Sequence, residues 1–158
     1  MEGDEKALHN LIYLTKLAER HFQGWIYWQF KYFQDLTTQG SGESFYDANG
    51  RLYEDKVKTL SRTYARAIAG TPVHTAFTET SGHFELDYEV NTSILAPTEI
   101  YLNEAWYYPD GYSAYLVIPV DGVTIQRQHN LILVNADPTT TINGTLVRVR
   151  VRATETTS

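Results

Sequence analysis

The sequence predicts two parts: an α/β segment that forms the last strand and helices of a (β/α)8 barrel, and a C-terminal antiparallel β-sandwich. Two observations predict this division. Apolar residues recur at helical spacing before residue 70, and they alternate with polar residues, as in half-buried strands, after Pro72. We therefore expect a barrel segment over residues 1–70, an all-β domain over residues 71–154 and a frayed tail over residues 155–158.

Two helices and one strand account for the first part. A stripe of apolar residues over 7–22 predicts a helix, which Gly24 ends. Residues 25–30 form a short apolar and aromatic run, which is typical of a strand buried on both faces. A second helix is predicted over residues 54–68, where the apolar spacing is again helical and Gly70 supplies the stop signal.

Short alternating strands account for the second part. Residues 84–90 and 147–151 alternate most regularly, with apolar side chains at every second position. Turn signals separate four shorter runs between them, which lie at 98–102, 112–118, 124–127 and 131–134. Many short strands at this spacing predict an antiparallel β-sandwich.

The predicted strand at residues 25–30 indicates that the first part is incomplete by itself. A strand buried on both faces needs parallel neighbours on either side, and the sequence supplies none before it. A helix–strand–helix segment of this kind is typical of the end of a larger α/β domain, such as the last turns of a (β/α)8 barrel.

The composition excludes several classes of function. A net charge of −6 argues against nucleic acid as a partner, because phosphate binding needs a basic surface. Cysteine is absent, which excludes disulfides, thiolate metal sites and cysteine nucleophiles. The five histidines show no metal-ligand spacing and no phosphate-binding loop occurs, so we expect neither a metal nor a cofactor.

Two features bear on location in the cell. The first six residues are acidic and polar, unlike a signal peptide, so the chain is either cytosolic as it stands or a fragment that lacks its N-terminal signal. Two possible N-glycosylation sequons, at Asn91 and Asn143, lie near predicted turns. They favour a secreted or lysosomal glycoprotein, whose signal would be absent from this chain.

Three stretches of the first part carry a resemblance to a known family: residues 24–38 with the piece Tyr-Trp-Gln-Phe-Lys, residues 44–47, and residues 58–70 with the piece Ser-Arg-Thr-Tyr-Ala. They resemble the C-terminal end of the barrel in endoglycoceramidases of glycoside hydrolase family 5. The β-sandwich that follows that barrel is similar to three further stretches, residues 82–88, 97–102 and 107–112. The resemblance extends to about residue 135.

The resemblance implies a retaining hydrolase that cleaves glycosphingolipids between glycan and ceramide. Such enzymes are similar in using two glutamates at the ends of barrel strands, one as acid/base and one as nucleophile. The Glu-Phe-Gly type motif of the nucleophile is absent here, and its nearest remnant, Glu2-Gly3, has no strand before it. We therefore expect no catalytic residue in this chain, both glutamates upstream of Met1, and no activity of the chain alone.

The resemblance also implies substrate-binding residues at the catalytic face of the barrel, just after the last strand. Trp28 is expected to form the floor of a sugar subsite, against the alternative of a core tryptophan, which is our interpretation of Trp25. Lys31 either donates a hydrogen bond to a sugar hydroxyl or forms a surface salt bridge. Asp35 follows on the same loop, and Gln29 is a further candidate.

Two patterns in the second part have competing interpretations. A stripe of arginines either contacts anionic lipid headgroups at a membrane surface or keeps a strand soluble while facing Glu85, Asp87 and Glu89; the second interpretation is favoured. The stripe consists of Arg148, Arg150 and Arg152. The aromatic cluster at residues 106–108 is either a lipid- or sugar-contacting patch or core lining at a corner, and core lining is favoured.

Three functions stay open on these observations. The first is the C-terminal portion of an endoglycoceramidase-like hydrolase, with the upstream barrel or another subunit as its partner and a glycolipid or oligosaccharide as its ligand. The second is a non-catalytic module that binds glycolipid or carbohydrate, and the third is a structural subunit derived from such an enzyme.

Overall fold

The computed structural model describes residues 2–31 and 43–154, except for the side chains of residues 2–4. The chain divides into two compact units, Met1–Ser61 (unit 1) and Arg62–Ser158 (unit 2). The division falls earlier than the boundary we expect at residue 70, because the residues that follow Ser61 already belong to the β-sandwich.

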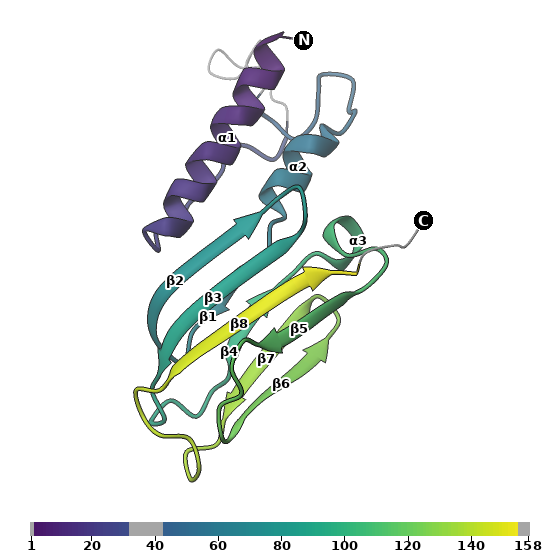
Figure 1. Cartoon of the computed structure of the whole chain (residues 1–158). Coiled ribbons are helices and arrows are strands. Elements are labelled where there is room, and N and C mark those ends of the chain that lie inside the picture. The colour runs from purple at the N-terminus through teal and green to yellow at the C-terminus, as the bar shows by residue number, and fades with distance from the viewer. Residues whose placement is uncertain (1, 32–42, 155–158) are drawn as a thin grey trace. The chain divides into compact units, whose positions relative to one another are not determined.

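The described residues of unit 1 form two helices, α1 (Glu2–Arg20) and α2 (Glu54–Leu60) (Figure 1). The predicted first helix is therefore confirmed. Thr15 is buried, and its hydroxyl donates to the Leu11 carbonyl at 2.9 Å. Tyr13 and Leu14 are exposed, so the described residues cover only part of the apolar surface of α1. Neither described helix of this unit, nor the short helix of unit 2, is long and apolar enough to span a membrane.

Residues 25–30 do not form the buried strand that the sequence predicts. This segment has no regular secondary structure, and most of its large side chains are exposed, Ile26 to 99% and Trp28 to 66%. A strand buried on both faces needs parallel neighbours, and the described part of unit 1 contains no such strand. The prediction of a strand is wrong, and among the described residues of unit 1 no strand pairs with this segment.

Unit 2 is a β-sandwich whose described residues form two four-stranded sheets, with every neighbouring pair antiparallel (Figure 1). The first sheet has the order β1 (Tyr64–Ala67), β4 (Thr98–Tyr101), β7 (Leu131–Ala136), β6 (Val123–Gln128). The second has the order β2 (Gly70–Thr78), β3 (His83–Val90), β8 (Leu146–Ala153), β5 (Tyr112–Leu116). The six predicted runs correspond to β3 to β8, which confirms the predicted sandwich.

The core of unit 2 lies between the two sheets and follows from the alternation in the sequence. On β3 and β8, the apolar residues at every second position are fully buried: Phe84, Leu86, Tyr88, Val147, Val149 and Val151. The opposite sheet contributes Ile100 and Ile132. The short helix α3 (Glu104–Tyr107) closes one end and buries Tyr107, and Tyr108 is buried beside it, so core lining is the correct interpretation of these tyrosines.

The second predicted helix ends earlier than its apolar spacing indicates. α2 stops at Leu60, and the residues Tyr64–Ala67 form β1 and pair with β4. Between them, Arg62 and Thr63 are buried in unit 2, and the Arg62 guanidinium pairs with the Glu79 carboxylate at 2.7 Å. These tertiary contacts outweigh the local preference for a helix.

Gly70 begins β2 instead of ending a helix. A side chain at this position would place its Cβ 2.0 Å from the carbonyl oxygen of Glu89 on β3, so the close approach of the two strands requires glycine. The sequence does not predict β2, because the pairing with β3 shifts between Pro72 and His74 and this irregularity interrupts the period of two.

Candidate functional site

The predicted substrate-binding residues that the structure describes lie on residues 25–31 of unit 1, which we call the aromatic segment. Hydrogen bonds join the backbone of this segment to residues 43–45. The Gln29 N–H donates to the Glu43 carbonyl at 3.4 Å, and the Phe45 N–H donates to the Gln29 carbonyl at 3.2 Å. The peptide bond between Trp28 and Gln29 is cis.

Aromatic packing fixes one side of this segment. The Tyr27 ring stacks on Phe45 with the ring centroids 5.3 Å apart, and Phe30 packs edge-on against Phe45 and Tyr46. Burial raises the pKa of the Tyr27 phenol, and the nearby Glu43 carboxylate raises it further. Tyr27 and Phe30 thus anchor the segment to the residues that follow it in unit 1.

The described substrate-binding candidates differ in their exposure. Trp28 is largely exposed and Lys31 is exposed, as a sugar platform and its hydrogen-bonding neighbour would need to be. Gln29 is buried, and its Nε2 atom has no hydrogen-bond partner among the described residues. Asp35 lies outside the described residues. Trp25 is 41% exposed, so its prediction as a core tryptophan is wrong, because the strand that would bury it does not form.

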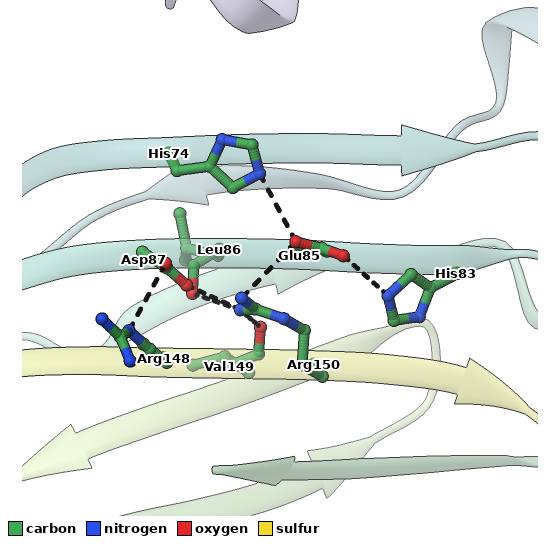
Figure 2. Close-up of polar contacts among 8 residues, drawn as sticks. All are labelled: His74, His83, Glu85, Leu86, Asp87, Arg148, Val149 and Arg150. Carbon is green, nitrogen blue, oxygen red and sulfur yellow. Dashed lines mark hydrogen bonds and ion pairs between the residues drawn. The ribbon is translucent and has the colours of Figure 1, made fainter. Parts of the chain in front are cut away.

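A second concentration of polar side chains lies on the face of the β2-β3-β8-β5 sheet that carries Glu85 and Asp87 (Figure 2). We call it the polar cluster, and it consists of His74, His83, Glu85, Asp87, Arg148 and Arg150. Glu85 is its centre. One carboxylate oxygen accepts from His83 Nε2 at 2.9 Å, and the other lies 3.4 Å from both His74 Nε2 and an Arg150 nitrogen.

The register of β3 and β8 explains why the arginines meet the carboxylates. Glu85 lies opposite Arg150 and Asp87 opposite Arg148, so these two carboxylates face the arginine stripe, as predicted. Glu89 lies opposite Leu146, so the prediction that it also faces an arginine is wrong. Arg150 contacts Asp87 diagonally at 2.6 Å.

The remaining arginine of the stripe, Arg152, is exposed, and its guanidinium lies 5.9 Å from the centre of the Tyr115 ring. Arg150 is mostly buried and held by two carboxylates. Two members of the stripe, Arg148 and Arg150, therefore pair with carboxylates across the strands, and the largely buried Arg150 is unavailable to lipid headgroups.

The electrostatics of the polar cluster are those of a stabilising network. Burial alone would raise the pKa of Glu85, but the hydrogen bond from His83 and the charge of Arg150 outweigh it, so the pKa lies below its usual value. A general acid in glycoside hydrolysis needs the opposite shift. Glu85 is therefore not suited to that role, and the described residues contain no group of three or more His, Asp or Glu side chains arranged to hold a metal ion.

The remaining candidate for the nucleophile, Glu2, lies in the first turn of α1. In a (β/α)8 barrel, catalytic carboxylates lie at the C-terminal ends of strands, so a helical position does not suit this role. Its side chain lies outside the described part of the structure.

Sequence reasoning missed the two histidines of the polar cluster. His74 lies on β2, which was not predicted, and His83 begins β3 two residues before Glu85. The signal that could have found His83 is the His-x-Glu spacing within an alternating strand, because residues two apart share one face of a sheet.

Comparison with known proteins identifies the family to which the chain is related. Residues 62–151, more than half of the chain, match the glycoside hydrolase family 5 C-terminal domain. The match begins at the first residue of unit 2. An endoglycoceramidase from Cyanea nozakii is 27% identical over 135 residues, which cover 82% of this chain and 26% of that protein.

Solved structures match both units. Endo-glycoceramidase II from Rhodococcus sp., in complex with a cellobiose-like isofagomine, is similar with a TM-score of 0.65 and 26% identity, over 94% of this chain and 29% of that one. Its ganglioside GM3 complex gives a TM-score of 0.65 and 25% identity over the same shares. The chain thus spans less than a third of the length of these relatives. It belongs to glycoside hydrolase family 5 through the C-terminal domain that its residues 62–151 form.

Proposed function

We propose that this chain is the C-terminal part of a retaining glycoside hydrolase that cleaves glycosphingolipids between the glycan and the ceramide, and that an upstream (β/α)8 barrel supplies both catalytic glutamates. The carrying observation is the similarity to the Rhodococcus endo-glycoceramidase II over 94% of the chain, a share too large to come from the β-sandwich alone. That enzyme has been solved with ganglioside GM3 and as a lactosyl-enzyme intermediate. A glycosyl-enzyme intermediate belongs to retaining chemistry.

The exposed apolar surface of unit 1 supports an upstream partner. Ile26 is fully exposed, and Trp25, Trp28 and Phe30 are each more than a third exposed on one short segment. Soluble proteins rarely leave so many large apolar side chains together in water. A neighbouring barrel strand beside the aromatic segment would pair with its backbone, and packing against the rest of the barrel would cover Ile26 and Phe30, which leaves Trp28 open to the substrate.

In this proposal the chain binds and positions the substrate, and it performs no proton transfer. The face of the Trp28 ring packs against the apolar face of a pyranose, which holds the sugar in place for the glutamates of the barrel. Lys31 donates a hydrogen bond to a sugar hydroxyl. The protein is secreted or lysosomal, a location that the two exposed sequons of unit 2 support.

The test compares the chain alone with a chimera. The chimera carries this chain in place of the matching part of the Rhodococcus endo-glycoceramidase II, and the Rhodococcus remainder without any replacement is the control. We expect glycan release from ganglioside GM3 by the chimera and none by the chain alone or by the control. Turnover by the isolated chain would contradict the proposed location of the glutamates.

A chimera that is folded, by circular dichroism, but inactive would contradict the enzymatic proposal. If the same chain then bound glycolipid vesicles, a non-catalytic binding module would be the better account. Stable association with a protein that lacks a barrel would instead favour a structural subunit.

A further inference from the structure

Two sequons meet at one end of the β-sandwich. Asn91 directly follows β3, and Asn143 lies on the loop between β7 and β8. The loop between β7 and β8 lies at the lower end of unit 2 in Figure 1. Their backbones are joined, because the Val90 N–H donates to the Thr145 carbonyl at 3.0 Å and the Gly144 N–H donates to the Val90 carbonyl at 2.8 Å. Two sites far apart in the sequence therefore share one small surface.

The side-chain amides of both asparagines have a defined orientation. Asn91 Oδ1 accepts the Ser93 N–H at 3.0 Å, and Asn143 Oδ1 accepts the Thr92 N–H at 3.0 Å. Because a backbone N–H needs an oxygen as its acceptor, these bonds fix which amide atom is the oxygen. Neither Nδ2 atom takes part in these hydrogen bonds, and both asparagines are exposed. Nδ2 is the atom that carries the sugar in an N-glycosylated asparagine.

The same end of unit 2 exposes aliphatic side chains from three loops. Leu95, on the loop that starts at Asn91, is 81% exposed, Ile142, which precedes Asn143, is 77% exposed, and Ile118 is also exposed. Uncovered aliphatic side chains gathered in this way indicate a surface that something else covers. The two candidates are a lipid bilayer and carbohydrate attached to the neighbouring asparagines.

The charges at this end favour carbohydrate over a bilayer. Asp121 and Asp137 are exposed on two of the same loops. Hydrogen bonds from the Thr139 hydroxyl and backbone N–H lower the pKa of Asp137, so its carboxylate stays ionised near neutral pH. Inserting ionised carboxylates into a bilayer is costly, whereas a hydrated glycan leaves them in water.

We infer that Asn91 and Asn143 are a pair of N-glycosylation sites, and that their two oligosaccharides cover the exposed aliphatic side chains of the loops around them. The donor is an oligosaccharide on a polyprenyl diphosphate. Nδ2 attacks the anomeric carbon, the N–C bond forms, the bond from that carbon to the diphosphate oxygen breaks, and the amide gives up one proton. The polyprenyl diphosphate is the leaving group, and the reaction needs no oxidant or reductant.

The experiment expresses the full chain behind a cleavable secretion leader in eukaryotic cells. The secreted chain is treated with an amidase that removes N-glycans in water enriched in ¹⁸O, which converts each glycosylated asparagine to labelled aspartate. We expect the band to migrate faster on a gel in two steps as the glycans are removed, and we expect label at Asn91 and Asn143 by peptide mass spectrometry. A secreted chain without label at either site would overturn the inference, and so would label at only one of them.

Matched variants separate glycosylation from folding. Ser93→Ala and Thr145→Ala each remove one sequon but leave both asparagines, and therefore the bond from Thr92 to Asn143, in place. Each is expected to remove one of the two mobility steps without changing the circular dichroism spectrum. Ser93→Thr and Thr145→Ser keep the sequons and are expected to keep both steps.

A separate experiment tests whether the two oligosaccharides cover the exposed aliphatic side chains. The double variant Ser93→Ala/Thr145→Ala is expected to bind a hydrophobic fluorescent dye more strongly than the glycosylated chain, and replacing Leu95 and Ile142 by serine in that variant is expected to cancel the increase. Equal dye binding by the glycosylated and unglycosylated chains would overturn this role. Flotation of the glycosylated chain with phosphatidylcholine vesicles would identify the loops as a lipid contact and would also overturn it.

Discussion

Arg150 on β8 donates a 2.6 Å hydrogen bond to the carboxylate of Asp87 on β3, although the register places Asp87 opposite Arg148. Both partners are only 15% exposed, so each would lose its nearest counter-charge in a largely dry position if the other were removed, with only the longer contacts to Glu85 and Arg148 left. We expect Asp87→Asn to lower the free energy of unfolding of unit 2 by about 2 kcal/mol, less than for a fully buried pair. Urea denaturation followed by circular dichroism measures this loss.

Arg152 provides the control for that measurement, because it lies on the same strand but is exposed and forms no ion pair with a described residue. Arg152→Gln should change the free energy of unfolding by about 0.5 kcal/mol or less. Equal losses in the two variants would contradict a specific contribution of the Asp87–Arg150 pair.

The pKa of Glu85 predicts how the stability of unit 2 depends on pH. Because this pKa lies below its unfolded value of about 4.3, Glu85 contributes stability above that pH and loses the contribution as the pH falls through the folded pKa. We expect Glu85→Gln to be less stable than the original chain at pH 6, with the difference shrinking steadily below pH 4. A difference that grows on acidification would contradict the direction of the shift. Denaturation midpoints at a series of pH values measure it.

Gly70 tests the close approach of β2 and β3. The added methyl group of Gly70→Ala would overlap the Glu89 carbonyl, so the two strands must separate, and we expect a loss of about 3 kcal/mol. Gly144→Ala is the matched control: it has a positive φ but open space around it, so it should cost about 1 kcal/mol. Thermal unfolding of the two variants ranks them, and a larger effect at Gly144 would contradict the overlap.

The alternating strands were predictable from the sequence because one physical requirement set their pattern. On β3 and β8, one face meets the opposite sheet and the other is polar or charged except at Leu146, so apolar and polar residues alternate along nearly the whole of both strands. The opposed charges also made the pairing of Glu85 and Asp87 with two arginines predictable. β2 lacks this regularity, because its pairing shifts after Pro72, and its histidine could not be assigned to the polar cluster.

Two elements could not be predicted because their conformation depends on parts of the protein distant in sequence. The stretch after Leu60 has helical apolar spacing, yet Tyr64 packs on Tyr101 of β4 and the backbone joins that strand. The aromatic segment has the composition of a buried strand, but no described strand of unit 1 lies beside it. For the candidate site, the sequence alone could therefore name Trp28 and Lys31 as candidates. It could not predict the irregular backbone on which they lie.

Tyr108 links two distant segments of unit 2 through one buried hydroxyl. It donates to the Gly82 carbonyl at 2.7 Å and contacts the Thr63 hydroxyl at 2.7 Å. Burial is the main reason that the pKa of Tyr108 is raised to about 12. Tyr108→Phe leaves both partners without this bond, and we expect a loss of about 2 kcal/mol in the free energy of unfolding. Tyr115→Phe, which removes a hydroxyl without a hydrogen bond to any described residue, should be nearly neutral.

Trp28 carries the most direct prediction of the proposed function. If its ring is a sugar platform, Trp28→Ala in the chimera should lower kcat/KM for ganglioside GM3 by about tenfold or more, which corresponds to ~1.4 kcal/mol of lost transition-state binding. Trp28→Phe keeps an aromatic face and should retain part of the activity. Trp25→Ala removes the other exposed tryptophan of the same segment and should leave kcat/KM within about twofold. Equal losses at Trp25 and Trp28, with the thermal stability of the chimera lowered equally, would mean that both rings pack against the barrel and that neither binds the sugar.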